Sequence, residues 1–558
     1  MSLPLQHRLE TELLLREQSK SQANKLEIAR WILEDGYYPE AYVIPPCFKI
    51  KGFNLSKDKL ETKDYNNGGW KSYEFATLSF PKTGLIQRVF SAIHPKRYHD
   101  IVWELMENWD ELLDKLFDSE NKIISYSFPL AISKDSRGKL RSGRMIYEFL
   151  EMAEKDLVAE AHKYSILGKV DITNFYNSVY THTISWAWIG DRKTALNDSR
   201  IFKTLGTKLD KLVQYSNDKR TNGLAVGPVL SDLIVEIILT ERDKEISKRI
   251  KSLNVDYIAT RFKDDYRILA NSKDECNEII KIIIEVLNEF NLQVNESKTK
   301  IIDLPEGLYR QHSLNYEPYS LRGKYESKKI PFKAFEFTLL KALEIHREYL
   351  GTSLLEKFLS ELIDNNKKIA INEKLLISFT NEKIPKEKEN YENVRKKNIK
   401  KAISLLLMVK NESAKSLGKV LSIIECIWVN PKNKWMEEEN YLFDIFMIEI
   451  EKALIKSSAF ELTWLIYFTV RHNFKIDLDR LIKTLSKDGK LNGAQGDLEI
   501  LKNCFVATLR NKMPNKGKWE NPFGDKNIKF RMYTNPEELT DVFLIDYLDV
   551  FERAEPEN

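Results

Sequence analysis

Three carboxylates stand where a divalent metal ion could bind. Asp171 lies in an apolar, β-prone run at residues 167–172, and Asp264 and Asp265 join two further β-prone runs at 257–262 and 266–270. Two acids at a hairpin tip can be ordinary turn residues. These two lie between aromatic and aliphatic neighbours, however, where uncompensated charge is costly. The pattern therefore favours a metal site.

The arrangement of these acids suits one class of reaction. Joining a 3′-hydroxyl to a nucleoside triphosphate needs two divalent ions, one to activate the attacking oxygen and one to steady the leaving pyrophosphate. Carboxylate oxygens suit Mg²⁺, with Mn²⁺ as a substitute. One acid from a strand and a pair from a neighbouring hairpin would supply such a ligand set.

Two other segments have compositions that fit the same chemistry. Residues 221–231 form a loop with Gly223 and Gly227 that opens a long apolar helix. Glycines let the backbone approach a base or sugar closely. The same sequence is also typical of an ordinary loop that precedes a helix. Lys298 follows in an Asn-x-x-Lys-Thr stretch, and taken alone it is a surface lysine.

Taken in order, these four segments resemble motifs A, B, C and D of reverse transcriptases. The match includes an aromatic five positions after the first acid, Tyr176. The resemblance implies that Asp171, Asp264 and Asp265 are the catalytic metal ligands. It also implies that Gly227 and Lys298 contact the nucleotide and that Tyr176 excludes a ribose 2′-hydroxyl.

The resemblance extends upstream to residues 80–90, which look like the fingers hairpin of the same enzymes. By that resemblance Lys82 and Arg88 grip the triphosphate of the nucleotide. The chemistry agrees, because Arg offers a fork to phosphate oxygens and Lys a point charge. Without the resemblance they are two exposed basic residues.

Two positions depart from the common pattern. Val226 stands where the loop usually has Gln, and Phe262 stands where the hairpin aromatic is usually Tyr. In enzymes that copy a template this loop touches the templating region. Val226 therefore predicts synthesis that departs from ordinary templating.

The combination of loop, polymerase length and helical C-terminal half resembles the abortive-infection and related defence-associated reverse transcriptases of bacteria. Residues 36–48 look like the N-terminal signature of that group. The resemblance implies a homo-oligomer that uses deoxynucleotide triphosphates, carries a DNA product and serves antiphage defence. Some relatives prime untemplated DNA from a protein tyrosine, which makes Tyr37 and Tyr38 candidates, although core packing is the commoner role of such rings.

Three alternatives stay open. Other relatives copy an associated noncoding RNA in the same defence role. A non-catalytic RNA-binding scaffold would not need costly clustered carboxylates, so the three retained acids argue against it. An RNA-dependent RNA polymerase would not need Tyr176 as a barrier to ribose.

The elements that must position these residues predict an α+β fold with an all-helical tail. Residues 1–326 are expected to form a reverse-transcriptase-like domain, with fingers at about 27–160 and a palm with an antiparallel sheet at about 161–326. Helices are expected at 25–34, 98–116, 231–253 and 273–291 and then, in an α-helical domain over 327–558, at 333–365, 398–409, 416–427, 440–457, 461–470 and 478–485.

The tail is long enough for about five helical pairs of a HEAT-like array, though an irregular bundle fits equally well. A basic run within it contains Arg395, Lys396, Lys397, Lys400 and Lys401. Such a run is usually a solvated face, and a nucleic-acid contact is the alternative.

Composition limits the class of protein. The chain has 558 residues, and its 42% hydrophobic share is enough for buried cores. Charged residues nearly cancel to +4, so an acidic partner must be held by local clusters of Lys and Arg. The four cysteines have no zinc-ligand spacing, and no stretch has the length of a membrane span or signal peptide. We expect a cytoplasmic protein without a membrane partner.

Overall fold

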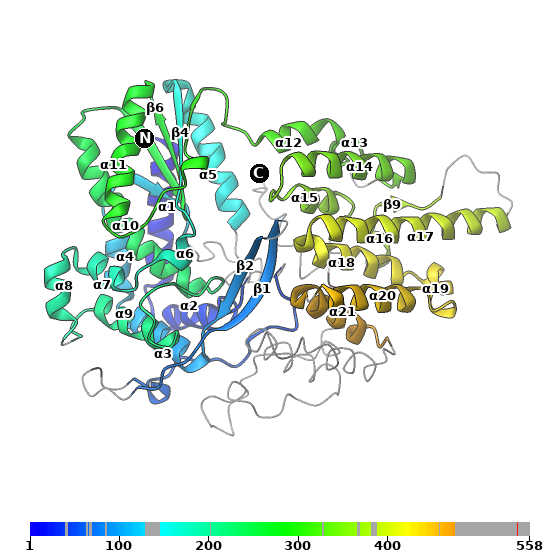
Figure 1. The fold of residues 1–558 in the computed structure, drawn as a ribbon, viewed down its shortest axis with the longest axis horizontal. Coiled ribbons are helices and arrows are strands. Elements are labelled where there is room, and N and C mark those ends of the chain that lie inside the picture. The colour runs from blue at the N-terminus through cyan, green and yellow to red at the C-terminus, as the bar shows by residue number, and fades with distance from the viewer. Residues whose placement is uncertain are drawn as a thin grey trace.

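The computed structural model describes residues 1–39, 43–62, 65, 70–83, 86–128, 146–200, 202–325, 328–364, 369–380, 388–456, 458–474 and 544. A mixed α/β half built from the earlier part of the chain lies beside a stack of helices from the later part (Figure 1). A long β-hairpin stands between the two halves. The fold is thus a mixture of helix and sheet followed by a helical C-terminal region.

A five-stranded sheet forms the centre of the first half. Its order is β3-β5-β6-β4-β7. The strands are β3 (Ile123–Ser125), β4 (Ile166–Asp171), β5 (Tyr257–Phe262), β6 (Asp265–Ala270) and β7 (Lys300–Asp303). The strands that lie within the predicted palm, β4 to β7, pair antiparallel as expected. β3 comes from outside that range and pairs with β5 in parallel. The long chain between β3 and β5 supplies the crossover that a parallel pair requires.

Helices surround this sheet. They are α1 (Leu3–Gln18), α2 (Gln22–Glu34), α3 (Pro95–Glu107), α4 (Trp109–Leu116), α5 (Ile146–Glu160), α6 (Phe175–Ser178), α7 (His182–Ile189), α8 (Arg192–Asp198), α9 (Leu205–Ser216), α10 (Val229–Lys251) and α11 (Lys273–Asn288). The helix expected over 98–116 is divided at Asn108, which leaves helical geometry at φ −113° and ψ 24°. Its side-chain amide donates to the carbonyl of Glu104 and so closes α3.

The hairpin predicted to form the fingers pairs β1 (Ala76–Thr83) with β2 (Ile86–Ala92) in antiparallel register. The distal part of β2 is exposed, and its last three residues are buried. At this buried end the amide of Ser91 donates to the carbonyl of Val226 over 2.8 Å. The hairpin is therefore attached to the glycine loop.

The helical half consists of α12 (Gln311–Tyr316), α13 (Arg322–Tyr325), α14 (Phe332–Glu348), α15 (Leu354–Glu361), α16 (Ile371–Lys374), α17 (Lys388–Glu412), α18 (Leu417–Trp428), α19 (Trp435–Glu438), α20 (Tyr441–Ile455) and α21 (Ala459–Arg471). The single helix expected over 333–365 is two helices, because Gly351 takes a left-handed φ of 84° between them. Strands also continue here, as β8 (Ile330–Pro331) pairs with β9 (Ile377–Ser378). The helix expected at 478–485 lies outside the described residues.

Two large apolar clusters form the core. The first joins the sheet to α2, α3, α10 and α11. The second fills the helical half but also contains Val43, Ile44, Cys47 and Phe90 from the first half. Packing thus continues across the predicted domain boundary. Among the described helices none has the length and apolar character to cross a bilayer.

Candidate active site

The sheet brings the three predicted carboxylates to one end. Asp171 ends β4, and its Cα pairs with that of Asp265 at the start of β6. Asp264 lies in the tight turn before β6, which Lys263 enters with a left-handed φ of 53°. The carbonyl of Asp264 accepts a 3.0 Å hydrogen bond from the amide of Ile172. Residues about ninety positions apart are thereby neighbours.

Asp264 and Asp265 are in surroundings that disfavour negative charge. Burial raises the pKa of Asp264, and the nearby charge of Asp171 raises it further. Burial likewise raises the pKa of Asp265 to about 6, against the opposing effect of Arg267. A cation would relieve this repulsion, so the donor set suits a divalent metal ion.

Lys298 supplies one positive charge at this point. It lies in a short 3₁₀ turn, Glu296–Lys298, and its Nζ donates to both oxygens of Asp171 at 2.9 and 2.8 Å. Over the described chain no three His, Cys, Asp or Glu side chains converge closely enough to hold one ion. The ammonium takes both oxygens of Asp171, so a metal ion binding there would compete with Lys298.

A buried ion network supports the hairpin of β5 and β6 on the side that packs against α10. Arg261 on β5 is almost fully buried and pairs with Glu236 at 2.9 Å and Asp243 at 2.7 Å. Its Nη1 also donates to the carbonyl of Lys263 at 3.2 Å. The network fixes the hairpin to α10. It was missed from sequence, although Glu236 and Asp243 are seven apart and so share one face of that helix.

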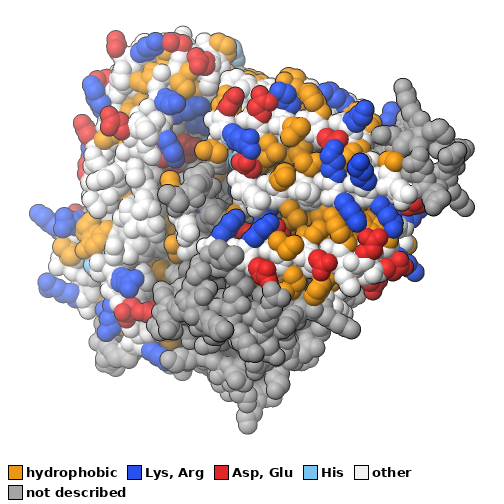
Figure 2. Space-filling view, turned by 45° about the vertical axis from the view of Figure 1, so that its right-hand side comes forward, with side chains coloured by type: hydrophobic (Ala, Val, Ile, Leu, Met, Phe, Trp, Pro, Cys, Tyr) orange, Lys and Arg blue, Asp and Glu red, His pale blue; other side chains and the backbone are white. Residues whose placement is uncertain are grey.

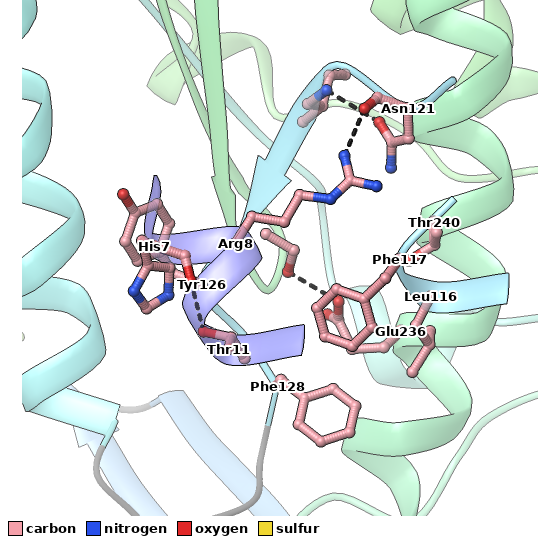
Figure 3. Close-up of a pocket in the computed structure, with 12 residues that line it drawn as sticks. His7, Arg8, Thr11, Leu116, Phe117, Asn121, Tyr126, Phe128, Glu236 and Thr240 are labelled. Atoms are coloured by element: carbon pink, nitrogen blue, oxygen red, sulfur yellow. Dashed lines mark hydrogen bonds between the residues drawn. The ribbon is translucent and has the colours of Figure 1, made fainter. Parts of the chain in front are cut away.

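A small pocket borders this network (Figure 3). Glu236 accepts a hydrogen bond from Ser125 there, and His7 stacks on Tyr126 with ring centroids 4.2 Å apart. The lining is His7, Arg8, Thr11, Leu116, Phe117, Asn121, Ile123, Ser125, Tyr126, Phe128, Glu236 and Thr240. None of the three candidate carboxylates lines it, so the pocket marks where α1 packs against β3 and α10.

Tyr176 lies in α6, directly after the strand that carries Asp171. The ring is half-buried, and its hydroxyl donates to Asp232 on α10. Its backbone carbonyl accepts from the amide of Leu224 at 2.8 Å. The aromatic residue and the glycine loop are thus held together.

Gly227 has a structural requirement of its own. Its φ is 125°, and an added Cβ would lie 3.2 Å from Cβ of Pro39 and 3.4 Å from the ring of Phe90. Only glycine fits this close approach without strain. Next to it, Val226 packs against the cluster of the helical half. The apolar side chain of Val226 therefore contributes to packing, whatever its role in templating.

Residues 120–339 match the family model "Reverse transcriptase (RNA-dependent DNA polymerase)". The chain carries a reverse-transcriptase domain. RNA-dependent DNA polymerases are nucleotidyltransferases, and the matched segment is similar to their domain. It contains all three carboxylates, Tyr176, Gly227 and Lys298, and it extends beyond the predicted end of the palm at residue 326.

A curated relative and several solved structures are also similar. The "Retron Se72 reverse transcriptase" of Salmonella heidelberg (strain 579083-10) is 27% identical over 135 residues, which are 24% of this chain and 32% of the relative. Apo telomerase from Candida tropicalis is 14% identical, with 66% of this chain and 69% of that chain covered and a TM-score of 0.30. Telomerase from Candida albicans with a fragment of telomeric RNA is 10% identical, with 64% and 61% covered and a TM-score of 0.29.

The fingers residues lie upstream of the matched segment. Arg88 is exposed on β2, where it pairs with Phe80 of β1. The side chain of Lys82 lies outside the described residues, although its backbone belongs to β1. A triphosphate contact for either residue stays a prediction.

The two candidate priming tyrosines differ in exposure. Tyr37 is fully buried, donates its hydroxyl to the carbonyl of Ile93 and packs 4.7 Å from the ring of Tyr98. Burial raises the pKa of Tyr37 well above its ordinary value. Tyr38 is half-buried and meets Phe48 edge-on at 5.9 Å. Tyr37 is thus a core residue here, and Tyr38 is the candidate with accessible surface.

The basic run of the helical half is used mainly for internal contacts. Arg395 is buried and donates to Asn433, while Lys396 and Lys400 pair with Glu439 at 3.3 and 3.1 Å. Lys401 pairs with Glu336. These contacts favour a structural role for the run.

Proposed function

We propose that this chain is a DNA polymerase of the reverse-transcriptase type that acts in bacterial antiphage defence. The observation that carries the polymerase assignment is the placement of Asp171, Asp264 and Asp265 at the same end of the sheet, within the segment that matches the family. Asp171, Asp264 and Asp265 would hold Mg²⁺, or Mn²⁺ in its place. The ions would supply activation of the 3′-hydroxyl and neutralisation of the leaving pyrophosphate.

The other residues of the site have distinct parts in this proposal. Tyr176 bounds the nucleotide site on the side of the sugar, and Gly227 allows the backbone to come close to the nucleotide. Lys298 stands beside Asp171 and offers a positive charge to the phosphates. Lys82 and Arg88 grip the triphosphate from the fingers hairpin.

Templating is the point on which two versions of the proposal differ. The departure at Val226 supports untemplated synthesis primed from Tyr38, whereas its packing against the helical half supports the alternative. In that alternative the chain copies a bound noncoding RNA, and the similarity to a retron reverse transcriptase supports it. A non-catalytic scaffold is disfavoured because it would retain mutually repelling buried acids without using them.

One assay separates these versions. Purified protein is treated with nuclease and then given Mg²⁺ and labelled deoxynucleotides. Label that migrates with denatured protein, is released only by protease and is absent from Tyr38→Phe supports protein priming. Activity that nuclease abolishes and added co-purified RNA restores supports the RNA-templated version. Absence of incorporation under every condition would contradict the polymerase assignment.

The helical half suits assembly into a homo-oligomer within the cytoplasm. Several large apolar side chains on three of its helices are exposed, namely Phe337, Leu340, Met408 and Ile448. Figure 2 shows apolar and basic side chains interspersed over the face of this half that comes forward. We assign residues 327–558 to a repeat-like domain that brings copies together. Light scattering that gives a monomer mass at micromolar concentration would contradict this part.

A further inference from the structure

The hydroxyl of Tyr176 donates to a carboxylate, that of Asp232 in the first turn of α10. The ammonium of Lys263 lies 3.5 and 3.4 Å from the two oxygens of the same carboxylate. These residues come from three separate segments: α6, the helix α10 that follows Gly227, and the turn between β5 and β6. One carboxylate therefore ties all three segments together.

This small group is held firmly in place. Asp232 is 5% exposed, and the helix N-terminus where it lies favours a negative charge. The backbone of Lys263 is fixed on both sides, because its amide donates to Oγ of Ser127 and its carbonyl accepts from Arg261. A buried carboxylate that has a cation on one side and a hydroxyl donor on the other is a stable anchor.

We propose that Asp232 and Lys263 are positioning residues that fix the ring of Tyr176 as a rigid wall, and that selection between deoxyribose and ribose depends on this contact. The inference rests on the proposed polymerase function. Ribose and deoxyribose differ by one oxygen atom, so a wall discriminates between them only if it does not move. The backbone of Tyr176 is already held by Leu224. The hydrogen bond to Asp232 restrains the two side-chain torsions that remain.

Tyr176→Phe is the central test, because it keeps the ring and the Asp232–Lys263 pair and removes only the anchor. We expect the preference for dATP over ATP, measured as the ratio of kcat/KM values, to fall about tenfold, the effect of losing a hydrogen bond to a charged group. The loss should come mainly from faster use of ATP. A change in dATP use alone would not support a role in sugar selection.

Variants at Asp232 and Lys263 test whether the effect passes through the anchor. Asp232→Ala should reduce the preference as Tyr176→Phe does, while Asp232→Asn, which keeps an acceptor oxygen, should retain part of it. The double variant Tyr176→Phe/Asp232→Ala should lose no more preference than the larger single effect. Lys263→Met should weaken the preference less than Asp232→Ala, since it leaves the hydroxyl contact in place.

Tyr180→Phe is the matched control. Tyr180 follows on the same segment, is half-buried and meets His182 edge-on at 4.8 Å. Its substitution should leave the sugar preference unchanged. A wild-type preference in Tyr176→Phe overturns the inference. Failure of the wild type to incorporate either nucleotide overturns the polymerase function instead. In that case, nucleotide binding decides the inference: the ratio of the dissociation constants for dATP and ATP is measured for the wild type and for Tyr176→Phe. Equal ratios in the two proteins overturn the inference.

Discussion

Asp264 and Asp171 repel each other across the end of the sheet, and burial strengthens the effect on Asp264. Such a pair costs stability when both groups are ionised and no divalent ion is present. Lys298 offsets part of that cost at Asp171. Under the proposed function, this cost in stability would be offset when a divalent ion binds.

The first prediction concerns Asp264→Ala. We expect loss of nucleotide incorporation by at least about a hundredfold, because a metal ligand is removed, with no fall in the urea midpoint of unfolding, because a repelled buried charge is removed as well. Asp171→Ala should be equally inactive, and Asp265→Ala less so. The matched control is Asp303→Ala, an exposed acid of β7 that pairs with Lys273 on the surface. Incorporation by Asp264→Ala at the wild-type rate would refute the assignment.

The second prediction concerns the effect of Mg²⁺ on thermal stability, which can be measured without catalysis. Mg²⁺ at about one hundred times its dissociation constant should stabilise the wild type by about 2.7 kcal/mol, seen as a higher thermal midpoint, and should not stabilise Asp264→Asn. Lys298→Met should respond to lower Mg²⁺ concentrations than the wild type, because the ammonium no longer competes for Asp171. An identical midpoint shift in wild type and Asp264→Asn would place the ion elsewhere.

At the scale of elements, the hairpin of β5 and β6 depends on Arg261. The third prediction is that Arg261→Met lowers the free energy of unfolding by about 3–5 kcal/mol, because Glu236 and Asp243 are left buried without their cation. Arg249→Ala, which breaks the partly exposed pair with Glu245, should cost less than about 1 kcal/mol. Chemical denaturation gives both numbers. Equal costs for the two variants would mean that the buried network does not support the hairpin.

The fourth prediction concerns α7 and α9, which are joined by His182 and Asp210. Their side chains lie 2.6 Å apart, and this hydrogen bond raises the pKa of His182 above 6.5. The pair therefore contributes its full stability below about pH 6.5 and loses it as pH rises through the raised value. The urea midpoint of His182→Gln should fall below that of wild type at pH 6 and approach it at alkaline pH. Exposed His162→Gln is the control, and a pH-independent difference would contradict the linkage.

The elements that the sequence predicted well are those whose boundaries have a local cause. β5 begins and ends where expected because its β-prone run stops at Lys263, directly before Asp264. β3 was missed because three residues carry no readable pattern. The breaks at Asn108 and Gly351 were missed because the apolar periodicity continues across both.

The site divides in the same way. Asp171, Asp264 and Asp265 were predicted from local motifs, and the strand register brings two of them together. The contacts of Tyr176 with Asp232, and of Arg261 with Asp243, join residues that are 56 and 18 positions apart. No local sequence pattern predicts which distant carboxylate will accept a hydrogen bond from a buried donor. These distant hydrogen-bond partners can be identified only from the structure.

At the scale of the whole molecule, the helical half is packed against the fingers. Trp464 of α21 is fully buried, and its indole Nε1 donates to the carbonyl of Val43 at 3.3 Å. Val43 and Phe90 share the apolar cluster of the helical half, and Phe90 also touches the space beside Gly227. Packing in the helical half therefore reaches the base of the fingers hairpin and the glycine loop.

The fifth prediction is that Trp464→Ala loosens both halves. Truncating this ring should cost about 3–5 kcal/mol, because a large buried side chain is lost and a cavity remains. Since Val43 loses its hydrogen-bond donor and Phe90 shares the same cluster, amide exchange should accelerate in β2 as well as in α18 and α21. Nucleotide incorporation should fall with it, because β2 holds the carbonyl of Val226 through Ser91.

Trp428→Ala serves as the control for that experiment, because Trp428 is half-buried in the same half and packs 5.3 Å from the ring of Phe474 rather than on the fingers. It should accelerate exchange in α18 and leave β2 protected. If Trp464→Ala changes exchange only within the helical half, the two halves unfold independently, and the contact with Val43 does not couple them. Faster exchange in β2 from Trp464→Ala alone means that the helical half stabilises the fingers hairpin, because Trp464 contacts Val43 across the boundary whereas Trp428 packs on Phe474.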